Sequence, residues 1–127
     1  MTVGIDLESA LANVKFLDGR TRHSDTTDTF ARLTEYRDGA IYAGGFSGVS
    51  PWERHPADEI VHILKGEAVI SLAFNQGTES QVLKAGMIIV VPQNIWHRFD
   101  AADGVTLMSI TPQPSEHTTD EAPPPSD

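Results

Sequence analysis

The sequence contains no cysteine among its 127 residues. This absence excludes disulfide bonds, thiolate metal sites and cysteine nucleophiles. Imidazole and carboxylate groups are therefore the only strong metal ligands that the chain offers. A protein without disulfides is compatible with a reducing compartment, and we expect it to be cytoplasmic.

The chain also lacks an excess of positive charge. It has nine lysine and arginine residues against eighteen aspartate and glutamate residues, and its formal net charge is −9. No basic patch for nucleic acid or anionic lipid is visible, so we expect neither partner. No apolar run approaches the roughly twenty residues of a membrane-spanning helix. The N-terminus lacks the basic and apolar regions of a secretory signal.

The chain does contain many short apolar or alternating segments, separated by glycine, proline, asparagine and aspartate. This pattern is typical of an antiparallel β-sandwich or barrel. The expected strands cover residues 29–37, 40–46, 59–64, 68–74, 81–83, 87–91, 97–99 and 105–111. Glycine-containing turns are expected at residues 38–39, 65–66 and 103–104, so that residues 59–64 and 68–74 would form a hairpin.

The two ends of the chain differ from this barrel segment, which we place at residues 29–112. Residues 1–14 have roughly helical apolar spacing, with Asp6 or Ser9 near the helix start, and a strand over residues 14–17 is the alternative. Residues 18–28 are polar and predict a loop. Residues 113–127 carry four acidic side chains and no lysine or arginine. We expect this tail to be disordered or extended, because it cannot bury enough apolar surface to offset its ordering entropy.

Two turn-rich segments carry the ligand types that divalent transition metals prefer. The first holds Glu53, His55 and Glu59, and the second holds His97. Residues two apart in a strand share a face, so Glu53 and His55 point the same way. A tight turn over residues 56–58 would bring Glu59 close to His55. Two imidazoles with one or two carboxylates suit Fe, Mn, Ni, Co or Zn and leave positions open for water, dioxygen or substrate.

These segments resemble the two signature motifs of the cupin superfamily. The first motif runs from His-x-His through Glu to Gly, and residues 53–66 match it. The second motif contains Gly, Pro-x-Gly, His and Asn, and residues 86–101 match it. The resemblance covers roughly residues 40–111. It implies an all-β, single-domain cupin, which is a double-stranded β-helix or jelly-roll barrel of two antiparallel sheets. It also implies one divalent metal held by His55, Glu59 and His97.

Three positions depart from the cupin motifs. Glu53 stands where the first histidine is expected, Asn94 where a glycine is expected, and Ala101 where the final asparagine is expected. Asparagine tolerates left-handed backbone geometry and can replace the glycine. Glu53 matches the ligand set by position only, and a solvated side chain at the barrel mouth is the alternative. A second carboxylate ligand would favour harder ions such as Mn(II) or Fe(II) over Cu(II).

The other histidines receive structural interpretations. His62 has the opposite strand parity to Glu59 and is expected to face away from the site. His23 lies in a polar loop and His117 in the tail, and both are expected to be solvated.

The residues next to the ligands also allow alternatives. Trp96 is expected on the outer face of the barrel. Trp52 and Arg54 share a face opposite His55, and we expect them to contact a partner subunit, with a guanidinium over an indole. The alternative for Arg54 is to bind a substrate carboxylate.

The resemblance implies two classes of function. The first is a metal-dependent enzyme that acts on an unidentified small organic molecule, with dioxygenase chemistry ahead of isomerase or lyase chemistry and with Glu53 in a catalytic role. The second is a non-catalytic small-molecule-binding cupin with a degenerate or structural metal site. Resemblance to small cupins also implies a homodimer, for which residues 1–28 are the candidate contact.

Overall fold

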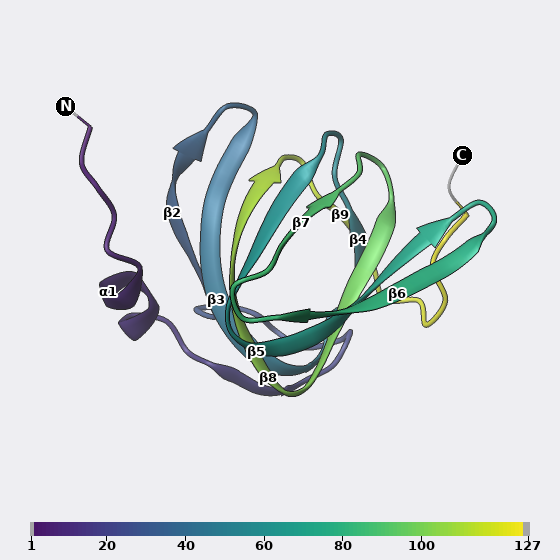
Figure 1. Cartoon of the computed structure of the whole chain (residues 1–127), viewed down its shortest axis with the longest axis horizontal. Coiled ribbons are helices and arrows are strands. Elements are labelled where there is room, and N and C mark those ends of the chain that lie inside the picture. Colours follow the sequence, from purple (N-terminus) through teal and green to yellow (C-terminus); the bar gives the residue numbers. More distant parts are fainter. Residues whose placement is uncertain (1, 126–127) are drawn as a thin grey trace.

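The computed structural model describes residues 2–125. Within this range the chain has one short helix and nine strands, and the strands curve around a common interior (Figure 1). Hydrogen bonds connect all nine strands into one rolled sheet. The expected all-β barrel is confirmed. The expectation of two antiparallel sheets is wrong, because β1 (Leu17–Arg20) and β3 (Gly39–Val49) pair in parallel and two long strands bend and run through both halves of one continuous sheet.

These two strands are β5 (Glu59–Phe74) and β8 (Trp96–Pro112), which pair antiparallel along most of their length. The turns expected at Lys65-Gly66 and Asp103-Gly104 are wrong, since both strands continue through them. Gly66 has a φ of 73° and Gly104 a φ of 100°. A Cβ on Gly66 would lie 2.2 Å from the carbonyl oxygen of Gly104. The two glycines therefore form a bulge that bends both strands together instead of reversing the chain.

The bulge shifts the side-chain alternation of β5 by one residue. Before it, Val61 and Ile63 are buried, and after it Ala68, Ile70 and Leu72 are buried. The buried face therefore passes from odd to even positions, and the interior stays continuous through the bend. The core contains these five residues together with Phe46, Leu83, Val91, Phe99, Ala101, Val105 and Leu107.

Shorter strands extend the sheet on both sides of β5 and β8. β6 (Gly77–Lys84) forms a hairpin with the second half of β5, and β7 (Ile88–Val91) pairs with the first half. The partner of residues 68–74 is therefore β6, and the expected hairpin with residues 59–64 is wrong. β3 (Gly39–Val49) pairs with β8, and β2 (Phe30–Tyr36) pairs with β3 through the predicted turn beside Asp38.

The N-terminal segment contributes a helix and a strand. α1 (Leu7–Ala12) begins after Asp6, whose carboxylate accepts hydrogen bonds from the amides of Glu8 and Ser9. This confirms a helix capped by Asp6, shorter than the expected range. β1 (Leu17–Arg20) pairs in parallel with β3. The loop expected over residues 18–28 is therefore wrong for residues 18–20.

The C-terminal tail is also partly structured. β9 (Glu116–Thr118) pairs antiparallel with β4 (Trp52–Arg54), and the indole Nε1 of Trp52 donates to the carbonyl oxygen of Glu121 at 3.1 Å. The expected disorder is wrong for this part, because backbone pairing and contact with a buried tryptophan offset the ordering entropy. For residues 126 and 127 the expectation lies outside the described residues.

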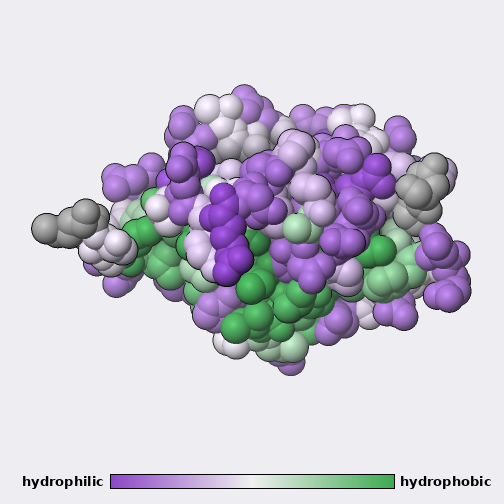
Figure 2. Space-filling view, turned by 90° about the horizontal axis from the view of Figure 1, so that it is seen from above, coloured by the Kyte–Doolittle hydropathy of each residue, from purple (hydrophilic) through white to green (hydrophobic). Residues whose placement is uncertain are grey.

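The face of the molecule in Figure 2 is mainly hydrophilic, with apolar side chains gathered along one side of it. Several large apolar side chains are exposed on or beside β5–β7, namely Ile60, Val69, Val82, Met87, Ile88 and Val90. Within residues 2–125 no helix has the length and hydropathy needed to cross a membrane.

Candidate metal centre

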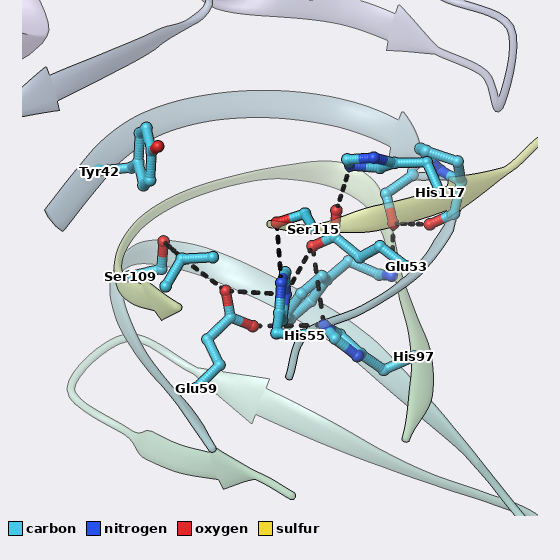
Figure 3. Close-up of polar contacts among 12 residues, drawn as sticks. Tyr42, Glu53, His55, Glu59, His97, Ser109, Ser115 and His117 are labelled. Carbon is cyan, nitrogen blue, oxygen red and sulfur yellow. Dashed lines mark hydrogen bonds and ion pairs between the residues drawn. The ribbon is translucent and has the colours of Figure 1, made fainter. Parts of the chain in front are cut away.

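The four residues predicted from the two sequence motifs meet inside the barrel. One ligand atom from each of Glu53, His55, Glu59 and His97 lies within 4.8 Å of all the others. Figure 3 shows the four side chains converging from different segments. His55, Glu59 and His97 are buried, and the Glu53 side chain is 23% exposed.

Strand pairing and two loop hydrogen bonds hold the motifs together. Glu53 on β4 is the direct cross-strand neighbour of His97 on β8. The amide of Asn94 donates to the carbonyl oxygen of His55 at 2.8 Å. Asn94 has a φ of 60°, which confirms that asparagine adopts the left-handed geometry of the motif glycine. In the second bond, the amide of Gln93 donates to Oδ1 of Asp58 at 2.8 Å. β4 does not pair with β5, so the turn over residues 56–58 positions Glu59 without forming a hairpin.

Both ligand histidines are oriented by contacts at the other ring nitrogen. Nδ1 of His97 lies 2.9 Å from the carbonyl oxygen of Ile95. A carbonyl oxygen can only accept, so Nδ1 carries the hydrogen and Nε2 of the neutral ring presents a lone pair. Nδ1 of His55 lies 2.9 Å from Oγ of Ser115. Contacts of this kind fix ring orientation in metal sites.

Glu59 is held by a buried pair of hydroxyl groups. Oγ1 of Thr111 donates to Oε2 of Glu59 at 2.6 Å. The hydroxyl of Ser109 lies 2.8 Å from Oγ1 of Thr111. Since the single hydroxyl hydrogen of Thr111 points to Glu59, Ser109 donates to Thr111. These two hydrogen bonds fix the Glu59 carboxylate so that Oε2 faces His55 and Oε1 faces His97.

The spacing of the ligand atoms fits a bound cation. Nε2 of His55 lies 3.3 Å from Oε2 of Glu59, and Nε2 of His97 lies 3.2 Å from Oε1 of Glu59. Oε1 of Glu53 lies 3.7 Å and 3.6 Å from the same two nitrogens. Ligands at about 2.1 Å from a shared ion would lie about 3.0–3.4 Å apart. The distances of Glu59 fall in this range, and those of Glu53 lie slightly above it. Nε2 of both histidines and Oε1 of Glu59 are buried without a hydrogen-bond partner, as expected of atoms that face an ion.

The four ligand side chains also determine one another's protonation. Burial lowers the pKa of both histidines, but Glu53 and Glu59 outweigh it and raise the pKa of His55 to about 9 and that of His97 to about 10. Burial raises the pKa of Glu53, yet His117, His55 and His97 together hold that pKa well below its usual value. Without metal at neutral pH, the cluster therefore contains imidazolium and carboxylate groups. A metal must displace the imidazolium protons.

A comparison with protein families agrees with the motifs. The family model of the cupin domain matches residues 43–111, more than half of the chain. This protein belongs to the cupin family. The search of curated proteins found no relative of this cupin.

Solved structures show the same fold. Protein NMB1881 from Neisseria meningitidis is 19% identical, with a TM-score of 0.67, over 87% of this cupin and 100% of that chain. A cupin-2 domain protein from Shewanella frigidimarina is 24% identical, with a TM-score of 0.56, over 67% and 80%. A hydroquinone 1,2-dioxygenase in complex with Cd²⁺ and 4-hydroxybenzonitrile is 19% identical, with a TM-score of 0.56, over 65% and 63%. At these identities the similarity establishes the fold alone.

One residue at the site of this cupin was not predicted from the sequence. Nε2 of His117 lies 2.9 Å from Oε2 of Glu53, and the His117 side chain is 54% exposed. His117 is exposed and lies outside the metal cluster, as expected, but its contact with Glu53 was not expected. No local sequence signal predicts the contact, because it depends on the pairing of β9 with β4. His62 lies outside the cluster, and His23 is exposed, as expected.

The outer face of β4 and β8 carries two stacked pairs. The guanidinium of Arg54 lies 4.8 Å from the ring of Trp96, and that of Arg98 lies 4.8 Å from the ring of Trp52. Arg54 forms a bidentate pair with Glu116, in which Nε donates to Oε1 at 3.2 Å and Nη2 donates to Oε2 at 3.3 Å. A guanidinium therefore stacks on an indole within one chain, while the expected contact of Trp52 and Arg54 with a partner subunit stays a prediction. The carboxylate that Arg54 binds is thus that of Glu116 in the same chain, and not the substrate carboxylate of the alternative interpretation.

A cavity of about 330 Å³ opens beside the cluster. Glu53, His55 and Glu59 line it directly. Its remaining wall combines apolar and polar side chains, among them Phe30, Phe46, Val61, Phe99, Leu107, Arg20, Tyr42, Ser109, Thr111 and His117. This volume lies near the lower end of the range for small-molecule sites, about 300–1,000 Å³. The cavity could therefore hold a small organic molecule against the metal ligands.

Proposed function

We propose that this cupin binds one divalent transition metal through Glu53, His55, Glu59 and His97 and uses it to transform a small organic molecule. The observation that carries the proposal is the set of buried ligand atoms that face one another without hydrogen bonds at the side of a cavity. When bound, such an ion supplies Lewis acidity, and iron also supplies redox chemistry with dioxygen.

We assign Glu53 to the ligand set. Its Oε1 lies at nearly equal distances, 3.7 and 3.6 Å, from Nε2 of His55 and of His97. Its Oε2 is held by His117. A carboxylate fixed in this way presents one oxygen to the cluster, which supports ligation in preference to a role as a freely moving base.

The other side chains at the site would orient the ligands and control access of water. Thr111 and Ser109 fix Glu59, while Ser115 and the carbonyl of Ile95 fix the histidine rings. The apolar wall would exclude water from the side of the cavity next to the cluster. Dioxygenase chemistry is the leading reaction class, because two histidines and carboxylates leave open positions on a metal. The similarity in fold to a hydroquinone 1,2-dioxygenase is compatible with this class.

Metal analysis tests the site. Protein stripped with chelator is loaded anaerobically with Fe(II), Mn(II), Ni(II) or Zn(II), desalted and analysed by mass spectrometry of the elements. We expect one equivalent of at least one metal in the parent protein and a loss of that metal in His97→Ala. His62→Ala is the matched control, because His62 lies on the same barrel outside the cluster, and it should retain the metal. Folded parent protein that retains none of these metals would refute the proposal.

Oxygen consumption tests the reaction class. The Fe(II)-loaded protein is screened with hydroquinones, catechols, keto acids and thiols in an oxygen electrode. Turnover that is lost in His97→Ala supports an enzyme of the dioxygenase type. Saturable binding of one of these compounds without consumption of oxygen or of the compound would favour the alternative, a non-catalytic cupin. In that case the same cavity would hold a ligand without changing it.

We also propose a homodimer. Ile60 on β5 and Ile88 and Val90 on β7 are exposed, and Ile60 pairs with Val90 across the two strands. A contiguous apolar face of this kind is typical of subunit interfaces. Light scattering coupled to size-exclusion chromatography should give twice the mass of the chain, and Ile88→Lys should shift the protein to the monomer. A monomeric parent protein would refute this.

A further inference from the structure

Arg20 is a charged residue of the cavity that the proposed metal centre does not use. It is the last residue of β1, and it lines the cavity together with Glu53. The Arg20 guanidinium lies 4.6 Å from the ring of Phe46 and 5.4 Å from the ring of Phe30. Its Nε is buried without a hydrogen-bond partner. Among residues 2–125, no carboxylate lies within ion-pair distance of it.

The backbone holds Arg20 at this place through a close contact that requires glycine. Arg20 is the register partner of Gly48 in the parallel pairing of β1 with β3. A Cβ on Gly48 would lie 2.1 Å from the carbonyl oxygen and 2.6 Å from the amide nitrogen of Arg20. Gly48 also has a φ of 100°, which side chains rarely allow. The cation is therefore fixed over the cavity by tight packing of the N-terminal strand.

The charges around the cavity leave Arg20 without a counterion. A divalent ion would be balanced by the two carboxylates of Glu53 and Glu59. Burial lowers the pKa of Arg20 and the nearby Glu53 raises it, but a guanidinium stays ionised at neutral pH. A metal-loaded site would thus retain one positive charge. A neutral ligand that displaced water from the cavity would leave this charge poorly solvated, whereas a monoanion would pair with it.

We propose that Arg20 binds the carboxylate of a small monoanionic substrate, whose apolar part lies against Phe46 and whose other end faces Glu53 and His55. The part of this inference that concerns the metal end rests on the function proposed above. The Arg20 fork is suited to two parallel hydrogen bonds with a carboxylate. The cavity volume of about 330 Å³ restricts the substrate to a small aromatic or aliphatic acid.

Paired probes of equal shape test this role. Benzoate and benzamide are titrated separately into zinc-loaded protein, and binding is followed by NMR chemical shifts. We expect the parent protein to bind benzoate at least about tenfold more tightly than benzamide, because only the carboxylate forms a charge-assisted hydrogen bond with Arg20. Arg20→Met should remove this preference by weakening benzoate alone. Arg20→Lys should retain part of it, and Arg32→Met, which changes an exposed arginine of β2, should retain all of it.

The same samples separate the two proposals. Metal content is measured in each, and the titrations are repeated with metal-free protein. Loss of metal binding in the parent protein contradicts the proposed function, while the benzoate preference of the metal-free protein still tests Arg20. Metal retained in Arg20→Met with unchanged benzoate affinity would refute the assignment, as would equal affinities of the parent protein for benzoate and benzamide. In either case Arg20 would only stack on the phenylalanine rings.

Discussion

Glu53 and His117 are direct cross-strand partners of β4 and β9, and Nε2 of His117 lies 2.9 Å from Oε2 of Glu53. On the other side of Glu53 in the same sheet lies His97. A half-exposed histidine of the C-terminal segment is thus connected through one carboxylate to the buried cluster. This arrangement connects the C-terminal segment to the candidate metal site.

Replacing His117 should therefore weaken metal binding without abolishing it. In His117→Ala the Oε2 atom of Glu53 loses its partner, and Glu53 becomes less well oriented. We expect an affinity about 10–100-fold lower with unchanged stoichiometry, as for other residues that orient metal ligands. Competition with a chromophoric chelator measures the affinity. His23→Ala, which changes an exposed loop histidine, should behave as the parent protein, and an unchanged affinity in His117→Ala would contradict the prediction.

The stability of the metal-free protein should decrease as the pH rises. The pKa values of His55 and His97 in the folded protein are about 9 and about 10, above the ordinary histidine value of 6.5. Raised pKa values stabilise the folded state fully below pH 6.5, and this stabilisation is lost as the pH passes through 9 and 10. Urea unfolding of chelator-treated protein between pH 6 and pH 10 measures the free energy of unfolding.

His97→Gln is the control for this pH dependence. Every group outside the cluster contributes equally to the pH dependence of the parent protein and of the variant. The parent protein should therefore lose more stability than the variant over this interval. Metal affinity should change in the opposite direction and rise with pH, since the imidazolium protons compete with the metal. Equal slopes of unfolding free energy in parent and variant would show that His97 is not held as an imidazolium.

Thr111→Val should destabilise the metal-free protein. The variant keeps the shape of the side chain but removes the hydroxyl that donates to Oε2 of Glu59 at 2.6 Å. Loss of such a hydrogen bond to a buried carboxylate lowers the free energy of unfolding by about 1.5–3 kcal/mol. Urea unfolding measures the difference, and Thr78→Val on the exposed face of β6 should change stability by less than about 0.5 kcal/mol. A neutral effect of Thr111→Val would mean that Glu59 is not fixed by this bond.

Gly66→Ala should disrupt the paired bend of β5 and β8. The added Cβ would lie 2.2 Å from the carbonyl oxygen of Gly104, and the φ of 73° is unfavourable for alanine. We expect a loss of more than about 2 kcal/mol in the free energy of unfolding. Gly86→Ala is the matched control, because its φ is 93° but nothing lies within 4 Å of its Cβ position. Gly86→Ala should lower the free energy of unfolding only by the cost of the left-handed backbone conformation, about 1–2 kcal/mol. Equal decreases in the two variants would contradict the close contact between Gly66 and Gly104.

The sequence predicted which residues gather in the candidate metal site better than it predicted the paths of the strands. Glycine-containing pairs such as Lys65-Gly66 usually reverse a chain, and a local reading cannot tell a turn from a bulge. The difference is decided by the opposite strand, where Gly104 leaves room for Gly66. The same limit applies to His117, whose role depends on a strand partner 64 positions earlier in the chain, at Glu53.

By itself, the sequence predicted the all-β class, the two motifs and the candidate ligands His55, Glu59 and His97, and it left the role of Glu53 open. Ligand types, strand alternation and motif spacing are local properties of the sequence, so they can be recognised without knowledge of the tertiary contacts. Only the tertiary structure decided that Oε1 of Glu53 faces both histidines and that Arg20 reaches the cavity. These placements depend on backbone pairing between distant segments. Gly48 has no Cβ and so leaves room for the backbone of Arg20, and His117 is the cross-strand neighbour of Glu53.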